Sequence, residues 1–318
     1  MLWSPSGRRT QALAQGAPLH AHGAVEGRFH PAVADSCAAA LAAAECVLIA
    51  VPGYAHRAVI EAMAPHLRPA HTVLFSSHMS FSAHYLRRLC PDTAVVAWGT
   101  TVVTGRMTGE SDVWVTNIRS LLDAATLPDA EAERGLALCR DAFGDRFLAR
   151  QGLIAVALSN LNPQNHLAIA LCNLTRMEKG ETWRQYANTT EAVGRLIEAL
   201  DAERLALAAA LGVSVRSIHE HFRLSFGAEG ATMGAMAAHL AAQGSDPNGP
   251  ATLDSRYVTE DVPFGLWPTV CLARTVGVAA PLHAAGVALF SALYGRDFTA
   301  ENDILPLLGD LSAVLRPD

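Results

Sequence analysis

Short apolar segments alternate with helical patterns through the first half of the chain. Residues 46–51 are apolar throughout, and residues 72–76 and 93–98 repeat this character before Gly, Pro or Ser turns. A run without polar alternation is typical of a parallel strand that is covered on both faces. Helical patterns over 55–66 and around 80–89 separate the three runs. This succession predicts right-handed βαβ units in a parallel sheet.

Weaker patterns surround these three strands. Ser36 is a good N-cap for an Ala-rich stretch, which predicts a helix to about residue 44. Gly144 follows a helical pattern over 129–143 and is expected to end it. The remaining expectations are a strand end at 1–3, one or two helical turns over 8–15, a β-hairpin or meander over 19–33, a strand at 113–116 and another near Phe147.

The character of the chain changes near residue 150. No convincing strand follows, whereas helical periodicity recurs to the end. The pattern over 190–211 predicts one buried stripe, with Glu198, Asp201, Glu203 and Arg204 largely outside it. We therefore predict an α/β domain over 1–150 and an all-α domain over 151–318. The predicted helices span 163–177, 190–211, 215–225, 228–242, 266–276, 281–294 and 304–315.

Composition excludes several classes of protein. With 51% hydrophobic and 17% charged residues, the 318-residue chain is expected to fold into packed domains. A net charge of −6 argues against a nucleic-acid partner, which requires a basic face. Glu45 and Pro52 interrupt the Ala-rich region, so it does not predict a membrane span. Arg8-Arg9 is not followed by the apolar core of an export signal, and we expect a cytoplasmic protein.

The six cysteines show no metal-binding or disulfide spacing. They are scattered without a C-x-x-C pair, and most lie in apolar segments, as buried free cysteines do. Cys46 and Cys271 are expected in the core. His219 and His221 diverge at i and i+2 on a helix, which is poor geometry for one metal ion. His78 and His84 are interpreted as surface or packing residues.

Residues 256–263, RYVTEDVP, place a guanidinium, a phenol and two adjacent carboxylates within eight positions. Pro263 and Pro268 are expected to interrupt any helix here, so the segment predicts a loop or a helix start. Arg256 can bind a substrate carboxylate through its two-pronged fork. The alternative is a structural pair with Glu260 or Asp261, or simply a solvated loop with a surface ion pair.

His166 is the candidate for acid–base chemistry. The sequence NPQNH over 162–166 places Asn as a cap and Pro163 at the first helical position, so His166 falls in the first turn. A lone histidine there is commonly a packing or capping residue. Asp261 or Glu260 could supply a carboxylate partner, although some ninety residues separate them from His166. Together, His166, Arg256 and Asp261 would suit polarising a carbonyl or imine while holding an acid.

The dinucleotide fingerprint of a Rossmann-like sheet is missing. No strand in the sequence is followed by G-x-G-x-x-G, and Gly227, Gly230 and Gly234 do not fit its spacing. We expect that about 30 residues, one strand–turn–helix piece, are lacking before Met1. On this interpretation Ser4, Ser6, Arg8 and Arg9 face the adenosine ribose. Ser and Arg suit a 2′-phosphate, so we favour NADP over NAD.

Three segments carry a resemblance to a known family. They are NPQNH at 162–166, TTEAVGRLIEALDAERLALAAALG at 189–212 and RYVTEDVP at 256–263; VLIAVPGYAH at 47–56 adds to them. With these segments, the chain resembles the octopine/nopaline (opine) dehydrogenase family over essentially its whole length. Ketopantoate reductases share the architecture without the RYVTEDVP stretch.

The resemblance implies an NAD(P)H-dependent reductive condensation of an amino acid with an α-keto acid. By the same resemblance, His166 would exchange the proton, and Asp261 would orient it. Arg256 would hold a substrate carboxylate. Val51, Pro52 and Gly53 would line the nicotinamide, and Thr100 and Thr101 would lie at the domain cleft. The family's glycine-rich pyrophosphate loop is not in this sequence.

Two alternatives remain open. One is a related reductase of a 2-keto acid or cyclic imine, similar to ketopantoate reductase. The other is a non-catalytic relative with impaired cofactor binding, which the missing loop favours and the retained His166, Arg256 and Asp261 oppose. The Ala-rich helical half leaves a homodimer open.

Overall fold

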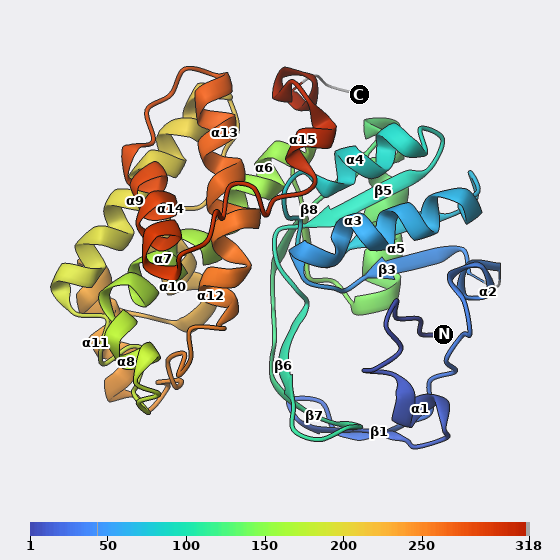
Figure 1. Ribbon diagram of the computed structural model, residues 1–318, viewed down its shortest axis with the longest axis horizontal. Coiled ribbons are helices and arrows are strands. Elements are labelled where there is room, and N and C mark those ends of the chain that lie inside the picture. The colour runs from blue at the N-terminus through green and yellow to red at the C-terminus, as the bar shows by residue number, and fades with distance from the viewer. Residues whose placement is uncertain (43, 316–318) are drawn as a thin grey trace.

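A computed structural model describes residues 1–42 and 44–315 of the chain. Two β-sheets with their helices form one part, and a bundle of helices lies beside them (Figure 1). Ala43, inside the helix predicted to about residue 44, lies outside the described residues. Among the described residues, no helix is both long and apolar enough to cross a bilayer.

The larger sheet has five strands in the order β3-β4-β5-β8-β9. β3 (Cys46–Ile49), β4 (Thr72–Phe75) and β5 (Ala94–Trp98) run parallel, which confirms the three predicted strands. β8 (Leu122–Leu127) then pairs antiparallel to β5, and β9 (Phe147–Ala149) pairs parallel to β8. β8 was not predicted, and it separates the parallel set from the short strand expected near Phe147.

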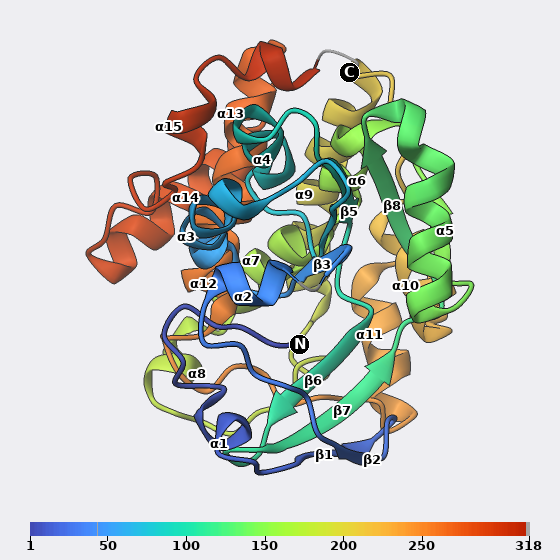
Figure 2. The same ribbon diagram turned by 90° about the vertical axis from the view of Figure 1, so that its right-hand side faces the viewer.

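Helices cover both faces of this sheet (Figure 2). α3 (Gly53–Met63) and α4 (Ser82–Leu89) lie on one side, and α5 (Ala132–Phe143) lies on the other. β4 and β5 are fully buried between them. The shorter helical elements of this half are α1 (Gln11–Ala14), α2 (Cys37–Ala42), η1 (Ala64–His66) and η2 (Asp129–Glu131).

The expectation that strand 46–51 is covered on both faces is wrong. β3 is an edge strand of its sheet, and only one of its faces is packed. Ile49 is buried, whereas Cys46 is exposed and Leu48 keeps 42% of its surface exposed. Alternate residues of a strand face opposite ways, so one uncovered face explains both exposed side chains.

A second, four-stranded sheet has the order β2-β1-β7-β6. β1 (Leu19–Gly23) and β2 (Gly27–Phe29) form the predicted hairpin, and β7 (Asp112–Ile118) contains the strand expected at 113–116. β1 also pairs in parallel with β7, which in turn pairs with β6 (Val103–Met107). The strand end predicted at 1–3 is only a single bridge between Leu2 and Val33.

Helices follow β9 to the end of the described chain, apart from one isolated bridge between Arg184 and Asn248. Residues 152–159, an apolar run without clear periodicity, form a helix that was not predicted. The elements of this half are α6 (Gly152–Ser159), α7 (Asn162–Cys172), α8 (Leu174–Glu178), α9 (Glu191–Ala210), α10 (Ile218–Phe226), α11 (Met233–Ala242), α12 (Arg256–Thr259), η3 (Val262–Leu266), α13 (Trp267–Thr275), α14 (Pro281–Tyr294), α15 (Leu305–Leu308) and η4 (Leu311–Leu315).

Two charged residues of the central helix α9 lie on its buried face, contrary to the prediction. Arg204 is fully buried and Asp201 nearly so, although both were expected outside the apolar face. Arg204 donates to Asp201 Oδ1 at 2.6 Å and to the carbonyl of Arg216 at 2.6 Å. The other Asp201 oxygen accepts the backbone N–H of Ile218 at 2.8 Å. The charges are buried because they join α9 to the start of α10, and buried charges require such partners.

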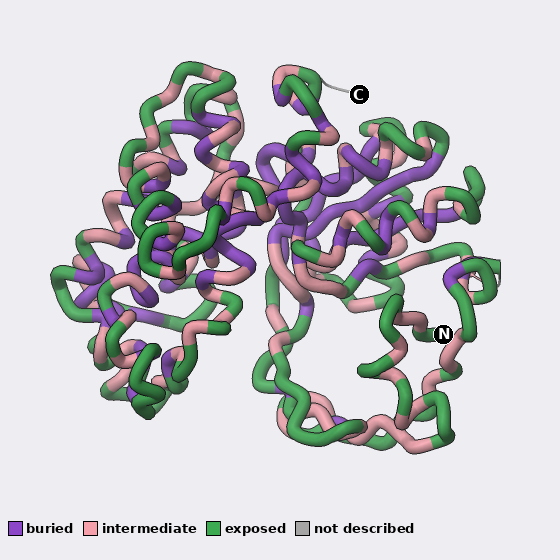
Figure 3. Tube along the Cα trace, in the orientation of Figure 1, coloured by how far each residue is buried: buried purple, intermediate pink, exposed green. Residues whose placement is uncertain are grey.

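Buried residues concentrate in the central strands β4, β5 and β8 of the larger sheet and on the inward sides of the helices (Figure 3). The segment from α15 to η4 returns from the bundle to the larger sheet, where Arg88 on α4 donates to the carbonyls of Leu307 and Leu308 at 2.7 and 2.8 Å. The cysteines are free, but only Cys37 and Cys139 are buried. The expectation that Cys46 and Cys271 lie in the core is wrong, because Cys46 is exposed and Cys271 is half-buried.

Candidate active site

His166 and Asp261 meet inside the helical half. His166 Nδ1 lies 2.6 Å from Asp261 Oδ2, although 95 residues separate the two in sequence. Asp261 is buried and His166 is partly buried. Burial raises the pKa of the Asp261 carboxyl, and the hydrogen bond from His166 acts in the opposite direction. A short contact to a buried carboxylate fixes the imidazole orientation and engages Nδ1, so Nε2 is the nitrogen left for another partner.

His166 is the fifth residue of α7. The helix begins at Asn162, whose backbone N–H donates to Asn160 Oδ1 at 3.1 Å. Asn160 therefore provides the cap that was expected from Asn162, and Pro163 occupies the second helical position rather than the first. The shift is one to two residues, and His166 remains near the helix start as predicted.

Tyr257 covers one face of the imidazole. The two rings stack with centroids 3.6 Å apart and an interplanar angle of 9°. The phenol donates to Gln185 Oε1 at 2.7 Å, and burial raises its pKa to about 12. A phenol that stays protonated does not act as an acid, and its ring serves as a packing surface for the imidazole. The phenol is part of RYVTEDVP, but its stacking on a ring 91 positions away leaves no local signal in the sequence.

The RYVTEDVP segment is helical where prolines were expected to interrupt it. Arg256 begins the four-residue α12, and the chain continues through a π-helical turn, η3, directly into α13. Pro263 lies inside this wide turn, and Phe264 still donates to the Glu260 carbonyl at 2.9 Å. π-turns are rare and frequently occur at functional sites. This one immediately follows Asp261, so it sets the direction of that carboxylate.

Glu260 connects the site to the larger sheet. Its Oε1 accepts the backbone N–H of Gly53 at 2.9 Å, directly after the carboxyl end of β3. Its Oε2 accepts a hydrogen bond from Arg256 Nε. Arg256 therefore makes the structural pair that was weighed as the alternative, yet 68% of its side chain stays exposed. The exposed part of the guanidinium remains able to bind a carboxylate.

The turn between β3 and α3 holds the predicted nicotinamide residues Val51, Pro52 and Gly53. His56 accepts a hydrogen bond from Ser82 at Nδ1 (2.9 Å) and donates from Nε2 to the Val51 carbonyl (3.2 Å). Burial lowers the pKa of His56 to about 4, so the ring is neutral. Its two hydrogen bonds connect the turn after β3 to Ser82 on α4. His56 lies within the VLIAVPGYAH stretch, but this connecting role was not predicted.

A second support comes from Asn302. Its amide nitrogen donates to Ser80 Oγ at 2.8 Å and to the Pro263 carbonyl at 2.7 Å, so it joins η3 to the loop after β4. This loop contains three non-glycine residues with positive φ, which are Ser77, Ser80 and Phe81. Such conformations are costly and persist where the surroundings enforce them, often beside functional sites.

The other predicted cofactor residues lie at the N-terminal segment. Arg8 and Arg9 line a cavity of about 390 Å³ with Gln11, Gln15 and Glu110. Ser4 is half-buried one turn earlier, where its carbonyl accepts the N–H of Gly7. Two guanidinium groups around a polar cavity suit a phosphate group, although the Glu110 carboxylate lines the same cavity.

Thr100 and Thr101 follow β5, next to the helical half. A side chain at the preceding Gly99 would contact Ser159 on α6, which shows how closely this turn approaches the bundle. The Thr101 hydroxyl donates to the Val103 carbonyl at 2.7 Å. It is therefore engaged within its own loop, and no contact in the described residues joins either threonine to His166.

Two further histidines and one further cavity complete the candidates for a site. His219 pairs with Glu198 at 3.1 Å. His78 is buried, and neither of its ring nitrogens has a hydrogen-bond partner in the described part of the chain. Burial lowers the pKa of His78 well below its ordinary value, and an adjoining cavity of about 30 Å³ has room for one water molecule. A cavity of about 520 Å³ around Arg150 and Gly212 includes none of the predicted site residues.

Known proteins resemble the chain in its sequence and its fold. Residues 149–294 match the family described as NAD/NADP octopine/nopaline dehydrogenase, alpha-helical domain. An opine dehydrogenase of Arthrobacter sp. (strain 1C) is 29% identical over 321 residues, which cover 97% of this chain and 88% of that protein.

Two solved structures share the architecture. Octopine dehydrogenase with NADH and L-arginine has a TM-score of 0.75 at 17% identity, covering 91% of this chain and 81% of that chain. Yersinopine dehydrogenase with bound NADP⁺ has a TM-score of 0.73 at 16% identity, covering 99% of this chain and 91% of that chain. At these identities the likeness to the two structures is one of fold.

Proposed function

Because residues 149–294 match the octopine/nopaline dehydrogenase family and the chain resembles an opine dehydrogenase over most of its length, we propose that it joins an amino acid to an α-keto acid by NAD(P)H-dependent reductive condensation. The chain is an opine dehydrogenase-like oxidoreductase, and the proposal concerns its substrates, an amino acid and an α-keto acid. The observation that carries the proposal is the 2.6 Å contact between His166 and the buried Asp261. This pair lies one residue from the Glu260 bridge to the β3 turn.

His166 is proposed to move the proton. The amine and the keto carbonyl lose water to form an imine, and reduction of the imine carbon requires a proton on nitrogen. With Nδ1 held by Asp261, Nε2 of a protonated His166 can donate that proton, and the buried carboxylate stabilises the imidazolium. Tyr257 restricts the ring to one plane. The nicotinamide, when bound, supplies the hydride.

Arg256 is proposed to hold a substrate carboxylate. Its exposed guanidinium is anchored through Nε by Glu260, which leaves the terminal nitrogens for a two-pronged contact. Thr100 and Thr101 stay proposed as substrate contacts at the edge of the same region. Their support is limited to the position of the β5 turn beside α6.

The cofactor is proposed to lie across the carboxyl ends of β3 and its neighbours, where open α/β sheets bind ligands. Val51, Pro52 and Gly53 would face the nicotinamide, and Ser4, Arg8 and Arg9 would face the adenosine ribose. The cavity beside Arg8 and Arg9 fits a phosphate, and this favours NADP over NAD. The sequence contains no G-x-G-x-x-G loop, so the pyrophosphate is not assigned to any residue.

The wider setting is also proposed. Residues 1–150 would bind the cofactor and residues 151–318 would supply the substrate site. We propose a cytoplasmic enzyme with small-molecule substrates, and a homodimer remains compatible with the helical half. Reduction of a 2-keto acid or cyclic imine alone is the alternative reaction; in that case no amino acid would be required for turnover.

Turnover with paired substrates tests the proposal. Purified protein would be given NADPH or NADH, a panel of amino acids and a panel of α-keto acids, with cofactor oxidation and the secondary amine product measured. His166→Ala should lower kcat by about 10²- to 10⁴-fold, the usual contribution of a positioned acid–base group, and spare cofactor binding. His66→Ala, which removes an exposed histidine on η1, is the matched control. Wild-type turnover by His166→Ala would refute the assigned role.

Cofactor preference has its own test. Arg8→Ala and Arg9→Ala should raise the KM for NADPH by about 10- to 150-fold, because a hydrogen bond to a charged group contributes about 1.5–3 kcal/mol. The KM for NADH should change little. Arg195→Ala, at an exposed arginine on α9, provides the control. An equal loss for both cofactors would contradict a 2′-phosphate contact.

A further inference from the structure

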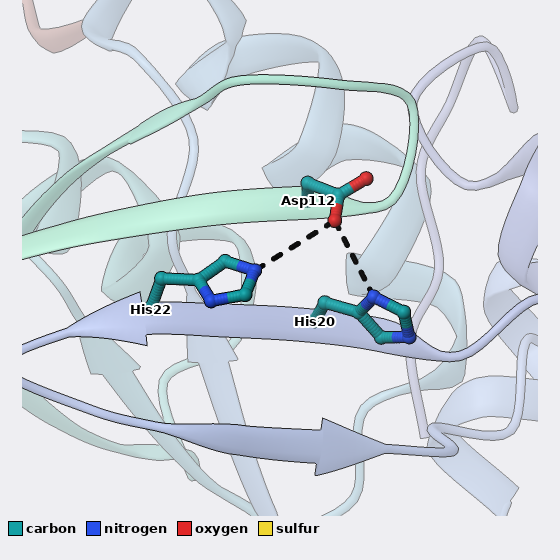
Figure 4. A group of neighbouring side chains, drawn as sticks. All are labelled: His20, His22 and Asp112. Carbon is teal, nitrogen blue, oxygen red and sulfur yellow. Dashed lines mark ion pairs between the residues drawn. The ribbon is translucent and has the colours of Figure 1, made fainter.

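Two histidines and one aspartate gather on the smaller sheet, away from His166 (Figure 4). His20 Nδ1 lies 3.4 Å from Asp112 Oδ1, and His22 Nε2 lies 3.9 Å from the same oxygen. One ligand atom from each residue falls within 4.8 Å of the other two. Both rings point toward the carboxylate, and all three side chains are partly open to solvent, with 33%, 55% and 42% of their surfaces exposed.

Strand geometry brings these residues together. His20 and His22 are two apart on β1, so their side chains leave the same face of the sheet. β7 runs parallel beside β1 with His20 in register with Asp112. The Asp112 carboxylate therefore reaches between the two imidazoles. A backbone pairing between segments about ninety residues apart holds the donors, so the arrangement does not depend on a flexible loop.

The donor set is the one that transition metals prefer. Imidazole suits zinc, copper and nickel, and a carboxylate completes many sites that retain open positions for water. Zinc bonds of about 2.1 Å in a tetrahedron place neighbouring ligand atoms about 3.4 Å apart. The His20–Asp112 separation already matches this spacing. His22 Nε2 needs to approach Asp112 Oδ1 by about half an ångström, and rotation of the exposed His22 side chain must also bring this nitrogen, now within 4.8 Å of the His20 ligand nitrogen, to the same spacing.

We propose that His20, His22 and Asp112 bind a divalent transition metal ion, with Zn²⁺ as the best-matched ion. The ion cross-links β1 to β7, and water fills the remaining coordination position on the solvent side. Mg²⁺ is a poor match, because it requires oxygen ligands in octahedral geometry. The site involves none of the residues assigned to the oxidoreductase reaction and does not rest on that function.

Arg28 makes the proposal unusually testable. Its Nε donates to His20 Nε2 at 3.1 Å, which places the imidazole proton on Nδ1, facing Asp112. Metal binding through Nδ1 moves this proton to Nε2, which can then no longer accept from Arg28. The guanidinium also repels the cation. Arg28 therefore competes with the metal, and its removal should strengthen binding.

Titration of the metal-free full chain tests the site. The chain would be stripped with a chelator and titrated with Zn²⁺, and separately with Mg²⁺, by calorimetry. We expect one tight Zn²⁺ per chain and no comparable Mg²⁺ binding. His20→Ala, His22→Ala and Asp112→Ala should each weaken Zn²⁺ binding by at least about 100-fold, since even outer-shell changes cost 10- to 100-fold. Arg28→Ala should tighten it by at least about threefold.

Two controls separate this site from other histidines. His66→Ala and His166→Ala should leave the Zn²⁺ affinity unchanged. Co²⁺ in place of Zn²⁺ should give the visible absorption of a four- or five-coordinate N/O site in wild type and Arg28→Ala but not in His20→Ala. Absence of tight Zn²⁺ binding to wild type, wild-type affinity in any of the three ligand variants, or weaker binding by Arg28→Ala would each overturn the proposal.

Discussion

Replacing Asp261 with asparagine tests how the His166 site works. The change keeps the size of the side chain and one oxygen that can accept from Nδ1, but it removes the negative charge. Asp261 Oδ2 lies 2.6 Å from His166 Nδ1, and the carboxylate is buried. The protonated imidazole would thus lose its only carboxylate partner within hydrogen-bonding distance among the described residues.

The magnitude follows from this contact. A hydrogen bond to a charged group contributes about 1.5–3 kcal/mol, and each 1.36 kcal/mol changes a rate tenfold. Asp261→Asn should therefore lower kcat by about 10- to 150-fold. Binding of NADPH should be unchanged, because Glu260 and not Asp261 contacts the turn after β3. Asp254→Asn removes one charge from an exposed position in the same region and should leave kcat unaffected.

Although Asp261→Asn should lower kcat, it should raise the free energy of unfolding at neutral pH. Burial raises the folded-state pKa of Asp261 above its ordinary 3.8, so the folded chain binds this proton more tightly than the unfolded chain. The associated stabilisation is complete below the unfolded pKa and is lost as the pH rises through the folded pKa. Asparagine does not titrate, and Asp261→Asn should therefore gain stability relative to wild type as the pH rises across this window.

Steady-state turnover and chemical denaturation at several pH values measure both effects. The combination of slower turnover with equal or greater stability at neutral pH is specific to a charge that serves catalysis. Full retention of kcat would show that the carboxylate does not stabilise a charged imidazole. A large loss of stability at neutral pH would instead make Asp261 a structural residue.

Three further changes test the supports of the site. Tyr257→Phe keeps the stacked ring and should retain kcat, whereas Tyr257→Ala should lower kcat by about 2- to 10-fold, the worth of an aromatic pair. Asn302→Ala should reduce the free energy of unfolding by about 3 kcal/mol, since it leaves the Pro263 carbonyl and other buried groups unpaired; denaturant melts measure this. Burial lowers the pKa of His56 to about 4, so wild type should lose up to about 3 kcal/mol as the pH falls from 6.5 to 4, and His56→Gln should flatten that loss.

The sequence predicted most elements whose periodicity is strong. The three parallel strands and helix α14 (Pro281–Tyr294) match closely, because apolar runs and a helical stripe are local signals. β8 was missed because LDAATL has a charged residue and small side chains. Its Asp123 is tolerated inside the sheet by Arg150 at 2.8 Å and by Arg216 at 3.2 Å. These partners lie up to 93 residues away and cannot be read from the strand itself.

Buried charges also explain why the helical half was only partly predictable. Arg204 and Asp201 were assigned to the outside of α9, as charged residues usually are, but each satisfies backbone groups of the α9–α10 connection. The pairing of His166 with Asp261 came from family resemblance and not from spacing. The His20, His22 and Asp112 cluster required knowledge that β1 pairs in parallel with β7, which alternation within either strand does not reveal.

Two adjacent carboxylates make the site possible. Glu260 turns toward the sheet and binds Gly53, whereas Asp261 turns into the bundle and binds His166. Successive helical residues point about 100° apart, so neighbouring positions can serve two partners on different sides of one segment. His166 and the β3 turn are thereby held in a fixed relation by two adjacent residues. Asp at position 260 and Glu at position 261 would have the wrong lengths and would break both contacts. These two positions therefore require Glu followed by Asp, and not merely two acidic residues.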